Sequence, residues 1–278
     1  MTTPHTPQHA APPGGRALAV AKRGAEHVLW ARVAGQRRLE ALRGTARPVP
    51  DSVPPTAVLQ TRAEAEAAVA AAKALRLPLH HDRVKNWDAL GAVGAVLALG
   101  GRDGALPQRV IDAGSARYSP ILPWLRLYGV PFLLGTNLEF GVPVRRDGVT
   151  FRYGDVTDTG LPDGSVDAIT CMSVIEHGVP IVPFLAESAR ILRPGGVLAI
   201  STDYDYDPPD TTGTSMYGVP VHIFGPGEIR ELVAQAGAAG LELVGELTEE
   251  ALQHPERPCH WKRTGLDYTF VLLTFRRR

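Results

Sequence analysis

The fold is indicated most clearly by residues 167–202, DAITCMSVIEHGVPIVPFLAESARILRPGGVLAIST. Its apolar runs predict a strand over 167–172, a helix over 182–192 and a second strand over 197–202. Alternation of strands and helices at this spacing is typical of a parallel sheet that is covered by helices. The same alternation extends from this stretch in both directions along the chain.

The surrounding sequence supplies the rest of the expected sheet. Further helices are expected over 120–128 and 228–239, and further strands over 109–113, 132–136, 149–153, 241–245 and 268–275. The last two strands have no long crossover helix between them, so we expect them to pair antiparallel at the sheet edge. The predicted fold class is α/β, with a seven-stranded, mostly parallel sheet, helices on both faces and an N-terminal helical extension.

The first 80 residues differ from the rest of the chain in composition and pattern. Residues 1–15 contain almost no large apolar side chains, which predicts a disordered tail. Helical patterns over 16–43 and 61–76 flank a proline-rich linker, RPVPDSVPP, at 47–55. Residues 16–80 are therefore expected to form a helical extension or lid, and residues 81–278 the main domain. Residues 16–47 hold eight basic and two acidic residues, which indicates either a solvated basic face or a helix that meets an acidic surface.

Composition excludes several classes of protein. The 278 residues carry 29 Lys+Arg and 29 Asp+Glu, and this balance argues against binding nucleic acid or anionic membrane by bulk electrostatics. The longest near-apolar run, 90–100, is too short to span a bilayer, and the N-terminus lacks the pattern of a secretory signal. Cys171 and Cys259 are too few for a disulfide scaffold or a tetrahedral zinc site. We expect a cytoplasmic protein with no metal, no nucleic-acid partner and no membrane partner; a homodimer is left open.

Ligands of an open parallel sheet bind beyond the carboxyl ends of its strands. The residues that follow these ends are therefore the candidates for ligand contact. They are Asp112, Gly114 and Ser115 after the first strand, Asn137 after the second, Asp155 and Val156 after the third, Ser173 and His177 after the fourth, and Asp203 after the fifth.

The chemistry of these residue types suits a charged, nitrogen-rich ligand. Gly114 permits a tight turn and a close backbone approach. Asp112 can accept hydrogen bonds from a cationic amine, and Asp155 from an amino group. His177 titrates near neutrality, so it can take a proton from a hydroxyl or an amine. Asp203 opens an acidic run whose carboxylates can orient hydroxyls, act as a base, hold a divalent cation, or simply form a solvated loop.

Two motifs resemble the class I S-adenosylmethionine-dependent methyltransferases. They are GDVTDTGLPDGSVDAITCMSVIEHG at 154–178 and ESARILRPGGVLAISTDYD at 187–205. In that family the first motif holds the adenine-binding acid and a Glu-His pair after the fourth strand, and the second holds the Leu-x-Pro-Gly-Gly turn before the fifth. The segment KNWD at 85–88 and the chain after residue 217 are similar to a bacterial subgroup met in glycan and secondary-metabolite pathways. The resemblance covers residues 80–276.

This resemblance implies a Rossmann-like sheet and S-adenosylmethionine as the cofactor. It implies methyl transfer, by in-line displacement, to a small-molecule acceptor such as a sugar-bearing or polar secondary metabolite, for example in antibiotic biosynthesis. The catalytic residues that it implies are His177 and Asp203. The cofactor-binding residues that it implies are Trp87, Asp112, Gly114, Ser115, Asn137, Asp155, Val156 and Ser173.

Two departures from the family pattern keep other interpretations open. The family's glycine loop reads Asp-x-Gly-x-Gly-x-Gly, whereas residues 112–118 read DAGSARY. The acid that binds the ribose is replaced by Asn137, and Glu139 is a substitute only if the loop bends. One alternative is a protein of this fold repurposed for a cyclisation or an isomerisation. Another is a non-catalytic subunit that stabilises an active partner.

Several candidates also have a purely structural interpretation. Trp87 suits a core or lid aromatic as well as a cofactor contact. Asp155 can cap a turn, because aspartate side chains accept hydrogen bonds from backbone amides two residues on. His177 can be a structural histidine whose side chain only forms hydrogen bonds with neighbouring residues.

Overall fold

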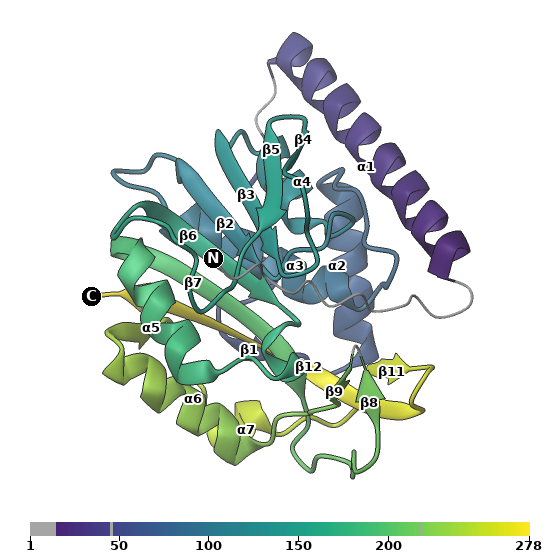
Figure 1. The fold of residues 1–278 in the computed structure, drawn as a ribbon, viewed down its shortest axis with the longest axis vertical. Coiled ribbons are helices and arrows are strands. Elements are labelled where there is room, and N and C mark those ends of the chain that lie inside the picture. Colours follow the sequence, from purple (N-terminus) through teal and green to yellow (C-terminus); the bar gives the residue numbers. More distant parts are fainter. Residues whose placement is uncertain (1–14, 45–46, 217) are drawn as a thin grey trace, which may run out of the picture.

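A mixed ten-stranded sheet runs through the centre of the molecule (Figure 1). The computed structural model describes residues 15–44, 47–216 and 218–278, so the tail expected over 1–15 lies, except for Gly15, outside the described residues. The strand order is β1-β12-β7-β6-β2-β3-β5-β4, and β10 and β11 each pair with β12. The five parallel strands are β2 (Arg109–Ala113), β3 (Phe132–Asn137), β5 (Val149–Tyr153), β6 (Val166–Met172) and β7 (Leu192–Tyr204).

The antiparallel edge has the predicted form. β12 (Leu266–Arg277) runs antiparallel to β7, and β10 (Leu241–Leu243) pairs antiparallel with β12. Three short strands raise the number from the expected seven to ten: β1 (Ala57–Val58), β4 (Val144–Arg146) and β11 (Cys259–Trp261). Strands of two or three residues show no alternation of apolar and polar residues, so sequence periodicity does not detect them. β8 (Ser215–Met216) and β9 (Val219–Pro220) form a separate two-stranded sheet.

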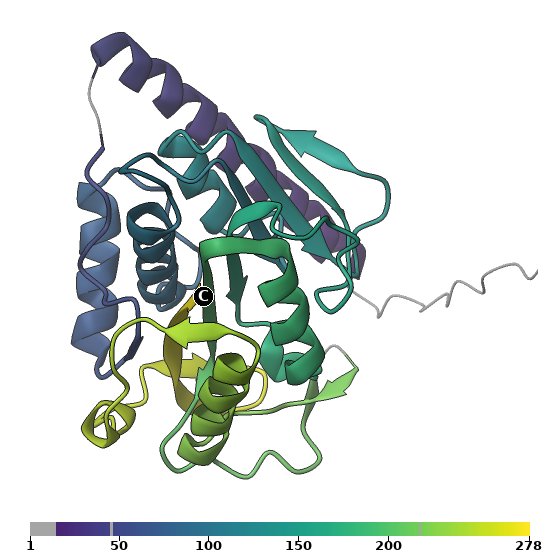
Figure 2. The same ribbon diagram turned by 90° about the vertical axis from the view of Figure 1, so that its left-hand side faces the viewer.

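Helices cover both faces of the sheet (Figures 1 and 2). One face carries α1 (Gly15–Arg43), α2 (Arg62–Ala74), α3 (Lys85–Leu99) and α4 (Ile121–Leu127). The other face carries α5 (Ile181–Ile191), α6 (Pro226–Ala238) and the short α7 (Glu249–Leu252). A 3₁₀ turn, η1 (Ile175–His177), follows β6.

Two hydrophobic cores form because successive side chains of a strand point to opposite faces. In β2, Val110 joins the core beneath α1–α4, whereas Ile111 joins the core beneath α5–α7. In β7, Ala199 and Ile200 divide in the same way. Burial on both faces explains why these parallel strands read as continuous apolar runs in the sequence.

Helix α1 lies along the outside of the molecule, beside α4, β4 and β5 (Figure 1). Its inner side buries Trp30 and Val33. The Trp30 ring meets the Phe151 ring edge to face, with 6.0 Å between the ring centroids. At the same face Arg146 Nε donates to Glu26 Oε1 at 3.3 Å. The helix is therefore anchored by an aromatic contact and an ion pair rather than free in solvent.

Two basic residues, one on α1 and one in the following linker, pair with acidic residues of the chain. Arg37 Nη1 pairs with Asp147 Oδ2 at 2.9 Å, and Arg47 pairs with Glu40. The outermost turn of the helix leaves Leu42 84% exposed. The choice between a solvated basic face and a helix that meets an acidic surface, and a lid function for α1, stay predictions.

The N-terminal segment also contributes to the sheet. β1 pairs antiparallel with β12, and the Leu59 amide donates to the Phe270 carbonyl at 2.9 Å. The division into 16–80 and 81–278 stays a prediction about domains, but the first of these regions supplies a strand to the sheet of the second. Among the described residues, every helix falls short of the length or apolar character that a membrane span requires.

We predict that Trp30→Ala lowers the free energy of unfolding by about 3 kcal/mol, because it removes a buried aromatic side chain and leaves a cavity. Leu42→Ala on the same helix is the matched control, and it should change stability by less than about 0.5 kcal/mol because Leu42 is exposed. Urea denaturation measures both values. Equal, small effects would contradict the packing of α1 against β5.

Candidate active site

The turn after β2 is built around a glycine that no other residue can replace without strain. Gly114 has φ +74°, and a Cβ at this position would lie 2.4 Å from Val174 Cγ2. Because that contact is far below van der Waals distance, the β2 turn and the segment after β6 approach each other only with glycine here. The retained first glycine of the family's loop therefore has a steric reason.

Asp112 places a buried carboxylate at the end of β2. Its side chain is 2% exposed, and Thr170 Oγ1 donates to Asp112 Oδ1 at 2.7 Å. Burial raises the pKa of Asp112 to about 6, although the hydroxyls of Ser115 and Thr170 oppose the shift. At neutral pH the group is mostly a carboxylate, so it can accept hydrogen bonds from a ligand or a loop amide.

Asn137 holds the β2 turn to the end of β3. Its Nδ2 donates to the Gly114 carbonyl at 3.3 Å and to the Ser115 carbonyl at 3.1 Å, and its Oδ1 accepts from the Glu139 amide at 2.8 Å. The Ser115 amide in turn donates to the Thr136 carbonyl at 2.8 Å. The amide that replaces the family's acid thus contributes to loop structure; a ribose contact for Asn137 stays a prediction.

The residues at and between the two changed positions of the glycine loop make contacts of their own. The Arg117 guanidinium lies over the Phe140 ring, 4.9 Å from the centroid. Ala116, at the second glycine position, accepts the Ser119 amide at its carbonyl at 2.9 Å and so forms a tight turn. The Tyr118 ring, at the third position, meets the His81 ring at 5.6 Å between centroids.

Asp155 and Val156 follow β5 at the same edge of the sheet. Asp155 Oδ1 accepts from the Thr157 amide at 2.8 Å and from the Thr157 hydroxyl at 2.7 Å, which is a turn-capping arrangement. Val156 is half-buried against the core beneath α5–α7. The structural role of Asp155 is therefore present, and its contact with an adenine amino group stays a prediction.

Trp87 and Ser173 occupy different environments. Trp87, on α3, is buried in the core beneath α1–α4, as the structural interpretation of this residue expects. Ser173 directly follows β6 with φ +53°, a conformation that is uncommon for a residue with a side chain. Its Oγ accepts a hydrogen bond from Lys85 Nζ at 2.7 Å.

Lys85 is the centre of a buried ionic cluster that the sequence did not reveal. Three carboxylates, on Asp88, Glu176 and Asp203, act electrostatically on its ammonium group, and none is more than 5% exposed. They come from α3, η1 and the end of β7 respectively. Ser201 Oγ donates to Asp88 Oδ2 at 2.7 Å, and the cluster therefore lies where the fourth and fifth parallel strands end.

Burial sets the proton affinities in this cluster. Desolvation raises the pKa of Asp88 to about 6, of Asp203 to about 7 and of Glu176 to about 8, and the charge of Asp203 adds to the shift of Glu176. The Lys85 ammonium opposes all three shifts. For Lys85 itself the three carboxylates outweigh desolvation, so its pKa is raised and the group stays charged.

His177 ends η1 next to this cluster and is partly buried. Burial, with a smaller contribution from the Lys85 charge, lowers the pKa of His177. The imidazole is therefore neutral at physiological pH, which is the protonation state that a general base needs.

The acidic run after β7 divides between two environments. Asp203 faces Lys85, whereas Asp205 is fully buried and receives Arg257 Nε at 2.5 Å and Nη2 at 2.9 Å. His254 Nε2 lies 3.6 Å from the Asp205 carboxylate. Among the described residues, no group of three or more His, Cys, Asp or Glu side chains is arranged to hold a metal ion.

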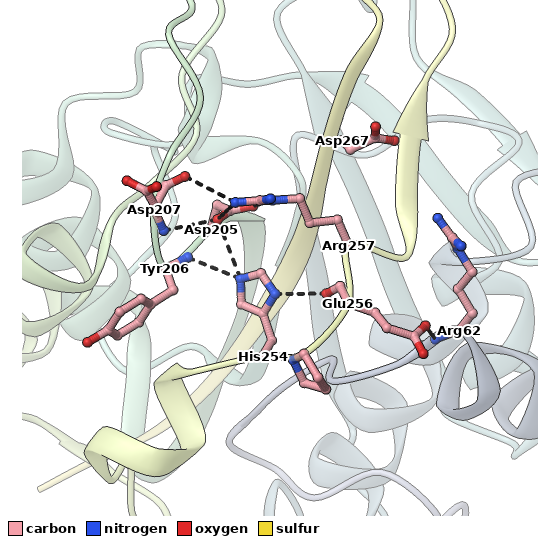
Figure 3. A pocket seen from close by; sticks show the side chains of 9 residues that line it. Arg62, Asp205, Tyr206, Asp207, His254, Glu256, Arg257 and Asp267 are labelled. Atoms are coloured by element: carbon pink, nitrogen blue, oxygen red, sulfur yellow. Dashed lines mark hydrogen bonds and ion pairs between the residues drawn. The ribbon is translucent and has the colours of Figure 1, made fainter.

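A pocket of about 350 Å³ opens beside this buried ion pair (Figure 3). Figure 3 shows Arg257 and His254 converging on Asp205, with Tyr206 and Asp207 on one side and Arg62 and Asp267 on the other. The pocket lies beyond the ends of β7 and β12, so it shares the sheet edge with Asp203 without including it. Its lining residues are Arg62, Asp205, Tyr206, Asp207, His254, Pro255, Glu256, Arg257 and Asp267.

Comparison with known proteins agrees with this arrangement. Residues 136–200, from the end of β3 through most of β7, match the methyltransferase domain family. Within this segment the chain is similar to the methyltransferase domain of S-adenosylmethionine-dependent enzymes.

The relatives share only parts of their length with this chain. A probable S-adenosylmethionine-dependent methyltransferase of Mycolicibacterium smegmatis is 43% identical over 61 residues, which cover 22% of this chain and 24% of that protein. Demethylmenaquinone methyltransferase of Beutenbergia cavernae is 32% identical over 129 residues, or 46% of this chain and 52% of that protein. The chain thus spans from about a quarter to about half of the length of these two relatives.

A solved structure with a similar fold is the 1,6-didemethyltoxoflavin N1-methyltransferase of Burkholderia thailandensis with bound S-adenosylhomocysteine. The TM-score is 0.46 and the identity 20%, with 80% of this chain and 95% of that chain covered.

The structure brings together residues that the sequence suggested and some that it did not. Asp112, Gly114, Ser115 and Asn137 form one connected turn region. In the sequence, Lys85 and Asp88 stand out only within the family-like segment KNWD, and Glu176 follows the fourth strand, where it suits either a helix cap or a cofactor contact. The signal that points to them is a pair of opposite charges three residues apart at the start of an otherwise apolar helix, residues 85–99, since such charges need buried partners.

We predict that the free energy of unfolding falls by on the order of 2 kcal/mol between pH 6.5 and 8.5. The folded pKa values of Glu176 and Asp203 lie above their unfolded values, so their contribution is full at low pH and is lost as pH rises through about 7 and 8. Burial lowers the pKa of His80 to about 3 and also lowers the pKa of His177; both act in the opposite direction, mainly below this window, because an unfolded histidine titrates near pH 6.5.

Chemical denaturation at several pH values measures this dependence. Glu176→Gln should flatten the curve, because glutamine does not titrate and can still accept from Thr202 Oγ1. Glu231→Gln, at an exposed position of α6, should leave the slope unchanged. A wild-type stability that rises over this pH range would show that the buried pair does not hold protons.

Proposed function

We propose that this protein is an S-adenosylmethionine-dependent methyltransferase that acts on a small, polar acceptor. The single observation that supports this best is the contact between the turn after β2 and the segment after β6, where the Gly114 backbone packs on Val174. This contact places the end of β2 next to the end of β6, at the edge where ligands of parallel sheets bind.

The residues present fit the cofactor. The backbone at Gly114 lies close to Val174 and the backbone at Gly154 lies close to Thr136, and a Cβ at either glycine would clash. The buried Asp112 carboxylate lies at the end of β2. When bound, S-adenosylmethionine supplies an electrophilic methyl group on a positively charged sulfur. The proposed contacts are Asp155 and Val156 with the adenine, Asn137 or Glu139 with the ribose, and Asp112, Gly114, Ser115 and Ser173 with the amino-acid end.

The proposed role of the protein in the reaction is to position the acceptor, exclude water and remove a proton. His177 is the proposed general base, since its imidazole is neutral at physiological pH and lies one residue from Glu176. Asp203, which is buried against Lys85 and Tyr268, is proposed to orient the site electrostatically rather than to touch the acceptor. Trp87 is proposed to support the site from within the core.

The acceptor class follows from the chemistry of the 350 Å³ pocket. Its lining carries the carboxylates of Asp207, Asp267 and Glu256 and the guanidinium of Arg62, so it suits hydroxyl and amino groups rather than an isoprenoid chain. A sugar-bearing or otherwise polar metabolite, as in antibiotic biosynthesis, therefore fits better than the menaquinone precursor named for one relative. The balanced net charge supports a small molecule over nucleic acid, and a cytoplasmic location and a homodimer remain part of the proposal.

The first test is ligand binding. We predict that the wild-type protein binds S-adenosylmethionine and S-adenosylhomocysteine with micromolar affinity in isothermal titration calorimetry. Gly114→Ala should weaken both by about tenfold or more, because the new Cβ displaces the turn from Val174. Gly227→Ala on α6 is the control, since no atom lies within 4 Å of its Cβ position. Circular dichroism checks that both variants fold; no binding to wild type at millimolar ligand would refute the proposal.

The second test is catalysis with a panel of glycosides, amino sugars, catechols and demethylmenaquinone. We predict S-adenosylhomocysteine release and a gain of one methyl group on a polar member of the panel. His177→Ala should lower kcat by roughly 100-fold with little change in cofactor KM, whereas His27→Ala, exposed on α1, should have no effect.

The same assay separates the alternatives. A converted acceptor with no change in mass indicates a cyclisation or an isomerisation. Turnover that requires a second protein indicates a partner subunit. Preference for demethylmenaquinone over every polar compound would contradict the assignment of the acceptor class.

A further inference from the structure

The chain turns directly after β6 at a residue whose backbone conformation is unfavourable. Ser173 has φ +53°, in the left-handed region where a Cβ approaches the following carbonyl oxygen too closely. Among the described residues, the other non-glycine positions with positive φ are Arg76, Asp103 and Asp147, and each lies in a turn between elements. Such a conformation persists only where surrounding contacts hold it, so the contacts of Ser173 are informative.

Ser173 is held by two hydrogen bonds. Its amide donates to the Ser201 carbonyl at 2.9 Å, which continues the pairing between β6 and β7, and its Oγ accepts from Lys85 Nζ at 2.7 Å. An ammonium group only donates, so the hydroxyl proton of Ser173 remains available to a further acceptor. The contact with Lys85 therefore fixes the Ser173 side chain and leaves its own donor for a ligand.

Lys85 is fixed in turn by its surroundings. It is the first residue of α3, and its Nζ lies over the Phe270 ring of β12, 5.0 Å from the ring centroid. Burial alone would lower the pKa of Lys85, but the charges of the nearby acids outweigh burial and raise this pKa. The ammonium therefore stays charged, and a charged donor forms a stronger hydrogen bond than a neutral one. The bond from Lys85 to Ser173 joins α3 and β12 to the end of β6.

The segment after Ser173 leads to the proposed cofactor site. The Gly114 turn packs on Val174, and His177, the proposed base, donates its amide to the Val174 carbonyl at 3.0 Å. Because Val174 follows Ser173 directly, a rotation of the Ser173 backbone would move Val174 relative to the Gly114 turn. The bond from Lys85 thus acts on the cofactor site through Ser173 and Val174.

We propose that Lys85 is a positioning residue, whose hydrogen bond to Ser173 Oγ holds the left-handed conformation after β6 and so places Val174 against the Gly114 turn before the cofactor binds. This inference rests on the proposed function. Without the bond, Ser173 relaxes toward the backbone conformations that residues with a side chain prefer. Cofactor binding must then restore the turn, which weakens the affinity.

Two substitutions of Ser173 separate the backbone conformation from the hydroxyl group. Both Ser173→Ala and Ser173→Gly remove the acceptor for Lys85 and any contact of the hydroxyl with a ligand, but only glycine adopts positive φ without strain. Isothermal titration calorimetry with S-adenosylhomocysteine should therefore give an affinity for Ser173→Ala that is about tenfold weaker than for Ser173→Gly. This comparison needs neither an acceptor nor turnover.

A double-mutant cycle assigns the effect to Lys85. Lys85→Met removes the donor and keeps a long, unbranched side chain. It should weaken binding about tenfold more in the wild-type background than in the Ser173→Gly background, because glycine needs no hydrogen bond to hold the turn. Effects of Lys85 on the neighbouring acids are common to both backgrounds and cancel in the comparison. If Lys85→Met does not fold, the two Ser173 variants still test the proposal, since Lys85 Nζ is the side-chain donor to Ser173 Oγ.

The chain offers matched controls. Asp103 also has positive φ, +51°, but it lies between α3 and β2, at the opposite end of β2 from the ligand edge. Asp103→Ala and Asp103→Gly should therefore bind S-adenosylhomocysteine with equal affinity. Lys73→Met, at an exposed position of α2, controls for the loss of a lysine. Circular dichroism checks that every variant is folded during the titration, so that a change in overall stability is not counted as a change in affinity.

The outcomes distinguish this inference from the proposed function. Weaker binding by Ser173→Ala than by Ser173→Gly, together with a background-dependent effect of Lys85→Met, supports the inference. Equal affinities of the two Ser173 variants, or an effect of Lys85→Met that is the same in both backgrounds, overturn it and leave the methyltransferase assignment intact. Absence of binding to the wild-type protein removes the proposed function itself, and the inference with it.

Discussion

The ammonium of Lys85, which donates to Ser173 Oγ at 2.7 Å and is stabilised electrostatically by the buried Asp88, Glu176 and Asp203, is the interaction on which the ligand edge of the sheet depends. These side chains come from a helix that precedes the sheet, from the turn after β6 and from the end of β7. Without the cation, three buried carboxyl groups would face one another across the strand ends, at a cost of several kcal/mol. The ion cluster therefore fixes how α3 meets the carboxyl ends of the parallel strands.

The same edge shows how a departure from the family pattern is accommodated. Asn137 replaces an acid, and its amide bridges the carbonyls of Gly114 and Ser115. Asparagine can donate these hydrogen bonds, whereas a carboxylate can only accept. The Asn137 amide thus stabilises a turn in which residues 115–118 all bear side chains.

The distribution of charge along the edge separates two kinds of environment. The cluster at Lys85 is closed to solvent, whereas the pocket beside Asp205 is open and lined by charged and polar groups. The proposed reaction uses both. In the water-poor region charges interact strongly, and the polar pocket suits molecules that bear hydroxyl or amino groups.

The parallel α/β sheet follows from the sequence alone, and so does the expectation that ligands bind at the carboxyl ends of its strands. The strand over 149–153 has the predicted bounds, and the strand over 109–113 does as well, because buried parallel strands read as apolar runs bounded by polar residues. The motifs likewise placed Asp112, Gly114 and Ser115 on one turn, since these residues are neighbours in the chain. Local periodicity and local motifs are properties that a sequence carries directly.

The contacts between residues that are distant in the chain depend on the tertiary structure. β1 has two residues and no periodicity, and it exists because Ala57 and Val58 pair with Leu272 and Val271. Lys85 lies at the start of α3, a helix outside the set that periodicity predicted, and its burial follows from the way α3 packs on β6 and β7. The Lys85 ammonium meets Ser173, which is 88 residues away in the chain, so this contact is a property of the tertiary fold.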